Sequence, residues 1–426
     1  MLKVKTTNKC MTEKKYVFDF VFSEIFGIAF EFETSDKPEF VLSYCGLELS
    51  FSSEFLEDDT NLNNFVGEIN SFELLKPQEL TLQSDLFGAC FYFLTCYREF
   101  GDVKRDKHNR VVCEFKQVET PIVDHIIEFI WCKIAKTWPN LVRREKVFKM
   151  NITCDVDQPY LESSTTISKT IRRMVGDIVK RTSVRKMVLT ALRYLDFKLG
   201  FLYFDPYYKG IFYLMDQAEK HGLKITFYFI CRKGVGPYDA RYSIEDEIIV
   251  KLFSIIKNRG HEIGIHGSYD SYNSEILLKE EVNTLSIALG YRNEKRVLGG
   301  RQHYLRWEPG KSQKILESIG LKYDSTLGFA DRVGFRVGTS HEHYMYDLYE
   351  RRKLSLRQKP LIVMECSVFD TNYMGLTDKE SALRKMCEMK QKCMDFGGTY
   401  TLLWHNSSFN NKSQKEIFDK VVRYNE

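Results

Sequence analysis

The chain has 426 residues, 43% of them hydrophobic and 14% aromatic, a composition that excludes an intrinsically disordered protein. Lys and Arg (62) nearly balance Asp and Glu (58), and the net charge of +4 is small for this length, so nucleic acid is not an expected partner. No apolar run is long enough to predict a transmembrane segment, and the N-terminal residues do not resemble a signal peptide. Eleven scattered cysteines without a C-x-x-C pair favour a reducing cytoplasm as the expected location.

The first 145 residues are expected to form a smaller α+β domain of unknown role. The hydrophobic stretch 39–51 suggests strands, and the segments 85–97 and 122–136 have the pattern of buried helices. The sequence LVRREK interrupts the apolar pattern around Arg144. We therefore predict a domain boundary there, with domains over 1–145 and 146–426.

A regular alternation of strands and helices is predicted from residue 149 onward. The predicted strands cover 149–154, 224–230, 261–266, 295–300, 360–366 and 399–404, and the predicted helices cover 207–221, 244–259, 274–288, 311–319 and 377–396. This alternation indicates an α/β fold with a mainly parallel sheet, either open or closed into a barrel. A basic, helix-forming insertion over about 161–204 separates the first two strands, and its possible roles are a lid, a docking surface or simply a solvated helix face.

Reactive side chains collect at the ends of the predicted strands. In parallel α/β folds, this edge of the sheet carries the catalytic groups. The residues concerned are Asp155 and Asp157 after the first strand, His266 at the third, Arg301, His303 and Tyr304 at the fourth, Glu365 at the fifth and His405 at the last.

The pair Asp155 and Asp157 can converge, because residues two apart on a strand point to the same face. Two neighbouring carboxylates repel each other, and a divalent metal at one with an arginine at the other would keep both ionised. The alternative is that one Asp caps the following turn and the other is solvated. A neutral imidazole at His266 would be a good ligand for zinc or a similar ion, whereas His261, at the start of the same strand, is assigned a structural role.

Four short motifs over about 149–410 resemble those of the polysaccharide deacetylase (NodB homology) family of carbohydrate esterases. The motifs are ITCDVDQ, GHEIGIHGSYDS, RQHY and LLWHN. YDSTLGFADRVGFR, FGACFYFLTCYREF and PIVDHIIEFIW resemble segments of bacterial members with an additional N-terminal domain. The resemblance implies a distorted (β/α) barrel, preceded here by the smaller α+β domain, and a metal-dependent removal of acetyl groups from glycans.

The resemblance also implies a role for each motif residue. Asp155 would be the catalytic base, Asp157 and His266 metal ligands, and His405 the general acid. Arg301 would steady the base, and the backbone at Tyr304 would face the oxyanion. The implied cofactor is a divalent metal, with zinc as the expected ion.

Two positions depart from the family pattern. Where a second His or a Ser usually follows four residues after the first ligand, this chain has Asp270. His303, which replaces the motif's Pro beside Arg301, is the preferred third metal ligand, and Asp270 is the alternative. The Asp that normally orients the catalytic His is replaced, with Glu365 as the nearest equivalent and Asp324 or Asp370 as weaker candidates.

The predicted function is a metal-dependent hydrolase that removes acetyl groups from a glycan or glycan precursor in cell-surface polysaccharide biosynthesis. An acetylated glycan is thus the expected partner, and the sequence does not define an oligomeric state. Two alternatives are kept open. One is a cyclic amide hydrolase on the same fold, and the other is a catalytically degenerate protein that binds a glycan or a biosynthetic partner.

Overall fold

The computed structural model describes residues 1–58, 70–101, 103–234, 236–291 and 297–423. The chain divides into two compact units, each assembled from separate stretches. Unit 1 comprises Met1–Lys149, Leu305–Val363 and Glu388–Thr401, and unit 2 comprises Met150–Tyr304, Met364–Cys387 and Leu402–Glu426. Compactness does not test the predicted boundary between residues 145 and 146, which stays a prediction.

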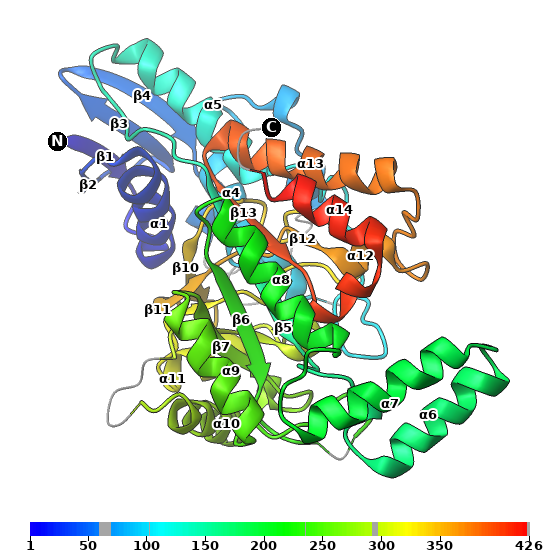
Figure 1. The fold of residues 1–426 in the computed structure, drawn as a ribbon. Helices are drawn as coiled ribbons and strands as arrows, with labels where there is room; N and C mark the ends of the chain where they lie inside the picture. The colour runs from blue at the N-terminus through cyan, green and yellow to red at the C-terminus, as the bar shows by residue number, and fades with distance from the viewer. Residues whose placement is uncertain (59–69, 102, 235, 292–296, 424–426) are drawn as a thin grey trace. The chain divides into compact units, whose positions relative to one another are not determined.

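Unit 1 contains a four-stranded sheet with the strand order β2-β1-β3-β4 (Figure 1). Its strands are β1 (Leu2–Thr6), β2 (Phe30–Thr34), β3 (Glu39–Tyr44) and β4 (Leu47–Ser52). β1 pairs parallel with β2 and antiparallel with β3. Cys45 and Gly46 both have positive φ and form the two-residue turn of the β3–β4 hairpin. The stretch 39–51 that suggested strands is therefore a β-hairpin.

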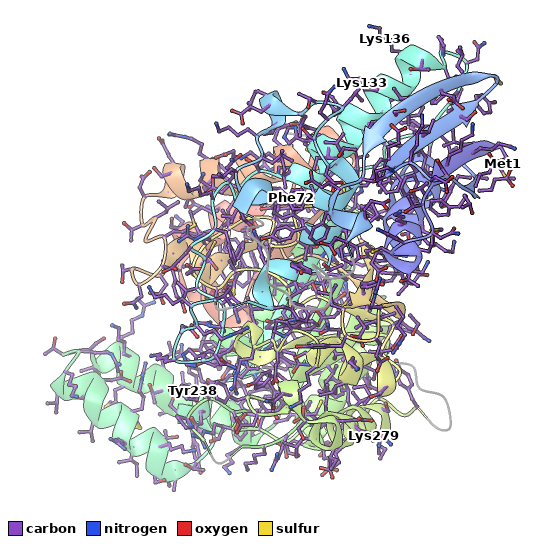
Figure 2. The ribbon with its side chains drawn as sticks, turned by 180° about the vertical axis from the view of Figure 1, so that it is seen from behind. Met1, Phe72, Lys133, Lys136, Tyr238 and Lys279 are labelled. Atoms are coloured by element: carbon purple, nitrogen blue, oxygen red, sulfur yellow. The ribbon has the colours of Figure 1, made fainter. Side chains whose placement is uncertain are left out.

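Helices pack on this sheet and form an aromatic core. They are α1 (Met11–Phe18), the π-helix η1 (Asp19–Phe26), α3 (Asn70–Glu73), α4 (Leu86–Leu94) and α5 (Ile122–Thr137). The rings of Phe18 and Phe87 stack with centroids 4.4 Å apart. On α5, Ile130 is buried, whereas Lys133 and Lys136 point away from the core (Figure 2). The two helices predicted over 85–97 and 122–136 thus correspond to α4 and α5.

Residues 305–363 belong to unit 1 and hold α11 (Ser312–Ser318) and the strands β9 (Tyr323–Asp324), β10 (His343–Asp347) and β11 (Arg352–Gln358). A buried salt bridge joins this stretch to the N-terminal residues, with Nη2 of Arg336 2.7 Å from Oε2 of Glu99. Asp124 on α5 accepts hydrogen bonds from the backbone N–H and the hydroxyl of Ser340 at 3.1 and 2.9 Å. These contacts join segments of unit 1 that lie far apart in the sequence.

Unit 2 is built on four neighbouring parallel strands in the order β8-β7-β6-β5. They are β5 (Lys149–Val156), β6 (Ile225–Ile230), β7 (Glu262–Gly267) and β8 (Gly299–Gln302). Every residue of β6 is buried, as expected for a parallel strand covered on both faces. Beyond β5, the carboxyl end of β13 (Thr399–Leu403) leads to Trp404, whose N–H donates to the carbonyl of Thr153 at 3.0 Å.

Helices separate these strands along the chain, so the protein is of the α/β class. They are α6 (Ile167–Val179), α7 (Val184–Lys198), α8 (Pro206–Lys220), α9 (Glu247–Asn258), α10 (Glu275–Ala288), α12 (Glu365–Phe369), α13 (Lys379–Phe396) and α14 (Lys412–Val421). α8 illustrates the local signals, because Asp205 accepts the N–H groups of Tyr207 and Tyr208, and Pro206 occupies the first turn. Gly222, with φ of 67°, follows the helix.

Two predicted strands differ from the structure. The strand predicted over 360–366 is reduced to β12 (Val363–Met364), and Glu365 begins α12. The carboxylate of Glu365 accepts the backbone N–H of His405, a contact that a short apolar run does not reveal. Part of the strand predicted over 295–300 lies outside the described residues, and β8 begins at Gly299.

Candidate active site

The parallel strands of unit 2 deliver polar side chains at their carboxyl ends. The register pairs Asp155 on β5 with Tyr228 on β6, and His266 on β7 with Arg301 on β8. Asp157 follows β5 and His303 follows β8. Because neighbouring parallel strands end at one edge of the sheet, residues far apart in the sequence become neighbours there.

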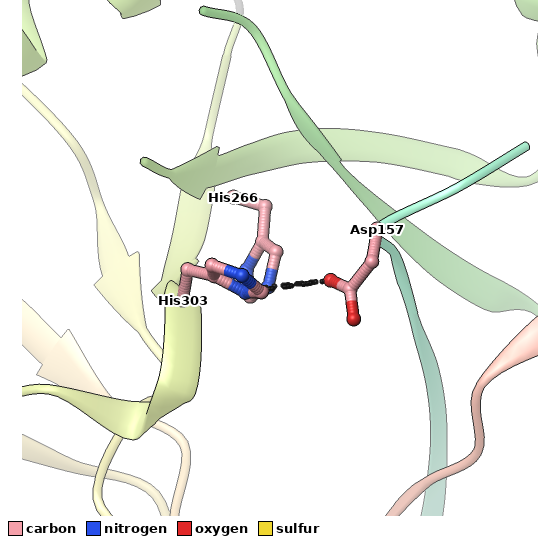
Figure 3. A group of neighbouring side chains, drawn as sticks. All are labelled: Asp157, His266 and His303. Atoms are coloured by element: carbon pink, nitrogen blue, oxygen red, sulfur yellow. Dashed lines mark hydrogen bonds and ion pairs between the residues drawn. The ribbon is translucent and has the colours of Figure 1, made fainter. Parts of the chain in front are cut away.

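Asp157, His266 and His303 converge on one point (Figure 3). Oδ1 of Asp157 lies 3.4 Å from Nε2 of His266 and 3.4 Å from Nδ1 of His303. The two imidazole nitrogens are 3.0 Å from each other. One carboxylate oxygen and two ring nitrogens therefore face a common centre.

The outer nitrogen of each imidazole is fixed by a backbone carbonyl. Nδ1 of His266 donates to the carbonyl of Arg301 at 2.8 Å, and Nε2 of His303 donates to the carbonyl of Tyr238 at 2.6 Å. A carbonyl can only accept, so the proton of each neutral ring is held on the outer nitrogen. The inner nitrogens of His266 and His303 then present lone pairs toward Asp157.

The charges of these groups are strongly coupled. Burial by itself raises the pKa of Asp157, but the imidazoles of His303, His266 and His405 outweigh it and hold that pKa well below its usual range. Burial lowers the pKa of His303, with Asp157 opposing. For His266, Asp155 and Asp157 overcome burial and raise the pKa. An ionised Asp157 is thus a negative charge that faces both rings, and Asp155 adds a second one at His266.

This arrangement fits a divalent metal ion. The three ligand atoms lie within 4.8 Å of one another, and Oδ1 of Asp157 is buried yet accepts no hydrogen bond from any described residue. A buried carboxylate oxygen without a donor is uncommon, and a bound cation would satisfy it. Two histidines and one carboxylate, with imidazoles fixed by carbonyls, are a donor set that suits zinc and similar ions.

Asp155 is held by a buried arginine instead. Nη1 of Arg301 donates to Oδ1 of Asp155 at 2.9 Å and to the hydroxyl of Thr153 at 2.8 Å. The guanidinium carbon lies 4.9 Å from the ring centroid of Tyr228. Gly264 makes room for that ring, because a Cβ there would lie 2.8 Å from Tyr228. The other carboxylate oxygen of Asp155 is 3.7 Å from Nε2 of His266, at the edge of the proposed metal position.

His405 approaches from the end of β13 and carries a different partner. Its Nδ1 donates to Oε1 of Glu365 at 2.7 Å, and its Nε2 lies 3.8 Å from Oδ2 of Asp157. Burial lowers the pKa of His405, but the Glu365 carboxylate outweighs it and raises that pKa well above the usual value. The same contact offsets the effect of burial on Glu365 and lowers its pKa. This raised pKa favours a cationic His405, whose Nε2 faces Asp157.

The remaining predicted residues occupy varied places. Asp270 is exposed and does not belong to the metal-binding group, whereas His303 does. Tyr304 adopts a left-handed conformation with φ of 60°, an uncommon backbone for a residue with a side chain. Asp324 lies in unit 1, and Asp370 is exposed, so within unit 2 it is Glu365 that meets His405.

Several contributors carry no local sequence signal. The carbonyl of Tyr238, the hydroxyl of Thr153 and the hydroxyl of Ser408, which donates to Glu365 at 2.9 Å, all act through contacts made by folding. Cys366 also lies here and forms a second possible metal-binding group with Glu365 and His405. Because Glu365 and His405 already bond to each other, we interpret this second group as an acid–base pair.

Aromatic side chains also surround His303. The rings of Tyr238 and Tyr269 stack with centroids 4.8 Å apart, and Tyr304 contacts both edge to face. Trp404 and Phe409, which lie near His405 in the sequence, are buried in the core. The three tyrosines are partly exposed and provide the aromatic surface at the site.

The comparisons with protein families and curated proteins are sparse. Residues 2–139 match the model of a family of unknown function (DUF7033). No curated protein matches the chain. The match lies inside the predicted N-terminal domain and assigns it no role.

Solved structures that match part of this chain include two described as polysaccharide deacetylases and a CE4 family pseudoenzyme. A putative polysaccharide deacetylase from Mycobacterium smegmatis matches 66% of this chain and 86% of its own, with 17% identity and a TM-score of 0.41. A probable polysaccharide deacetylase from Pseudomonas aeruginosa PAO1 matches 65% and 84%, with 12% identity and a TM-score of 0.40. A CE4 family pseudoenzyme from Bacillus anthracis matches 66% and 60%, with 12% identity and a TM-score of 0.31.

Among the described residues, no helix is both long and apolar enough to cross a membrane.

Proposed function

We propose that this protein is a metal-dependent hydrolase that removes acetyl groups from a glycan or glycan precursor, on a distorted (β/α) barrel of the polysaccharide deacetylase type. The observation that carries the proposal is that three histidines with two kinds of partner face Asp157 at one edge of the sheet. His266 and His303 turn lone pairs toward Asp157, and His405 turns a charged N–H toward the same point. The motif resemblance adds the reaction class.

Asp157, His266 and His303 would hold the metal. A bound divalent ion supplies Lewis acidity, which lowers the pKa of water and polarises the acetyl carbonyl. Asp155 would accept the proton of the attacking water through Oδ2, which lies 3.7 Å from Nε2 of His266, while Oδ1 accepts from Arg301. Arg301 orients that carboxylate and carries a permanent positive charge beside it.

His405 would protonate the departing amine or alcohol. Its Nδ1 donates to Glu365, so Nε2 is the nitrogen that delivers the proton. The main-chain N–H at Tyr304, set by the left-handed backbone after His303, is the proposed donor to the developing oxyanion. Tyr238, Tyr269 and Tyr304 provide partly exposed rings for stacking on a sugar. Action on a cytoplasmic precursor of cell-surface polysaccharide is part of the proposal.

The direct test is acetate release from acetylated oligosaccharides by purified protein with added zinc. We expect release that requires the metal, that disappears on chelation and that falls by about 10²- to 10⁴-fold in Asp155→Asn. Asp216→Asn is the matched control, because Asp216 is a surface partner of Arg259. Equal rates for wild type and Asp155→Asn would contradict the proposal.

Two further measurements separate the alternatives. A stoichiometric divalent ion in the purified protein favours deacetylation over cyclic amide opening without metal. Oligosaccharide binding without turnover, whatever metal is added, would identify a degenerate binding protein.

A further inference from the structure

The helical hairpin formed by α6 and α7 buries polar side chains and exposes aliphatic ones. The two helices lie side by side (Figure 1) and make up the predicted insertion over 161–204. Asp177 and Thr190 are almost fully buried between them, and the hydroxyl of Thr190 donates to Asp177 at 2.6 Å. Arg181 also contacts Asp177 at 2.6 Å. A buried polar contact between Asp177 and Thr190 therefore joins the two helices.

Aliphatic side chains are exposed on both helices. On α6 they recur at Ile167, Ile171, Val175 and Ile178, and on α7 at Val184, Val188, Leu192, Leu195 and Leu199. The spacing of three or four residues places each set on one face of its helix. Exposed Phe201, Tyr203 and Phe204 follow α7. Thirteen of the 25 exposed large hydrophobic residues lie in these 44 residues, so the stripes are a concentrated feature of the described surface.

The same segment carries the positive charge of the protein. Residues 161–204 hold nine Lys and Arg against three Asp and Glu, a net charge of +6, whereas the whole chain has +4. Arg172, Arg173 and Lys180 line a groove on α6 together with Val175 and Val179. Basic groups thus stand directly beside the exposed aliphatic residues.

We propose that the α6–α7 hairpin docks on an anionic lipid surface, with the aliphatic stripes in the interfacial region and the basic side chains on lipid phosphates. Helices with an aliphatic face and a Lys- and Arg-rich polar face bind membranes in this way, without crossing them. Charge complementarity favours this occupant over a second copy of the chain, because pairing two hairpins would bring two +6 segments together. The proposal is independent of the proposed enzymatic activity.

The test is flotation of the full-length protein with lipid vesicles. One set contains phosphatidylcholine alone, and the other contains phosphatidylcholine and phosphatidylglycerol in a ratio of about two to one. We expect binding to the anionic vesicles that weakens as salt is raised and at least about tenfold weaker binding to the neutral ones.

Two variants divide the surface into its components. Val188→Ser/Leu192→Ser/Leu195→Ser removes part of the aliphatic stripe of α7, and Arg172→Gln/Lys180→Gln/Arg185→Gln removes three charges. The charge variant is expected to weaken binding to anionic vesicles by more than about tenfold, because one basic side chain near such a surface contributes about fivefold. The aliphatic variant is also expected to weaken it by more than about tenfold, because it removes apolar area that would be buried in the interface. All six positions are exposed, so the fold, followed by circular dichroism, should be kept.

The matched control is Ile276→Ser/Ile287→Ser/Lys279→Gln on α10, where Ile276 and Ile287 are 72% and 75% exposed and Lys279 lies at the surface (Figure 2). It is expected to bind vesicles as the wild type does. The proposal would be overturned if wild type did not bind anionic vesicles, or if the hairpin variants bound as well as wild type. Self-association of the wild type that the α7 variant abolishes without any vesicle binding would also overturn it, because the stripe would then be a contact between copies.

Discussion

The two histidine environments at the strand ends of unit 2 differ in what holds the outer ring nitrogen. For His266 and His303 the partner is a backbone carbonyl, which carries no full charge, whereas for His405 it is the buried carboxylate of Glu365. A carbonyl fixes the tautomer without adding a full negative charge, whereas a carboxylate in the same place also strongly stabilises the protonated ring. The same side chain is therefore suited to the proposed role of metal ligand in one place and of proton donor in the other.

The largest effect is expected for Asp157, one of the proposed metal ligands. Asp157→Asn removes the negative charge that faces both ligand imidazoles while keeping the shape of the side chain. Metal affinity should fall by more than about 100-fold, because changes even to the outer partners of ligands cost about 10- to 100-fold. Titration of the metal-free protein with zinc, followed by calorimetry, measures the change. An unchanged affinity would remove Asp157 from the ligand set.

Glu365→Gln should make His405 more like the neutral histidines, because it removes the carboxylate that stabilises the protonated ring. The Glu365 carboxylate raises the pKa of His405, so its loss should lower that pKa. The general acid acts in its protonated form, and activity is lost as pH rises through its pKa. We expect kcat to fall by about 100-fold near pH 8 and the alkaline limb of the pH–rate profile to move to lower pH.

A purely structural role for Glu365 would instead lower the rate equally at every pH. Metal affinity serves as the internal control in this variant, since Glu365 does not belong to the group formed by Asp157, His266 and His303.

A smaller effect is expected at Thr153→Val. The variant keeps the shape of the side chain but removes the hydroxyl that accepts from Arg301 at 2.8 Å and donates to the carbonyl of Leu402 at 3.1 Å. Arg301 would hold Asp155 less firmly, and one such hydrogen bond contributes about 1 kcal/mol. We expect kcat to fall roughly fivefold with metal affinity unchanged. A loss of metal affinity would show that Thr153 acts on the ligand side.

The smallest effect is expected at Asp270→Asn. Asp270 is exposed and lies outside the group formed by Asp157, His266 and His303. Zinc affinity and kcat should both stay within about twofold of wild type, as is usual for exposed substitutions. A drop in affinity comparable to that of Asp157→Asn would make Asp270 the third ligand and His303 a supporting residue.

The contrast between ligand and acid could only partly be read from the chain. The alternation of apolar runs and helix-periodic segments predicted the α/β class, and the positions of β5, β6 and β7 agree closely with it. Glu365 was placed at the end of a long strand, but it begins α12 after a two-residue strand. Periodicity could not detect this change, because a short apolar run is compatible with either a strand or a buried helix.

Whether Asp270 or His303 meets Asp157 and His266 depends on the tertiary structure. In the sequence, Asp270 is four residues from His266, whereas His303 is 37 residues away. Pairing of β7 with β8 places Arg301 opposite His266 and brings His303 to the same edge, while the chain after β7 leads Asp270 to the surface. The residue that the structure brings to Asp157 and His266 is therefore His303, the third ligand preferred from the sequence, rather than Asp270.

By itself, the sequence determined the α/β class, the places of Asp155 and His266 near the ends of their strands and the basic character of the insertion, because these follow from local pattern and composition. Only the tertiary structure decided which partner each histidine has and which face of the hairpin is exposed. The carbonyls of Arg301 and Tyr238 and the carboxylate of Glu365 reach their histidines across different strands and loops. The pKa of an imidazole depends on such contacts and on burial, and neither is fixed until the chain has folded.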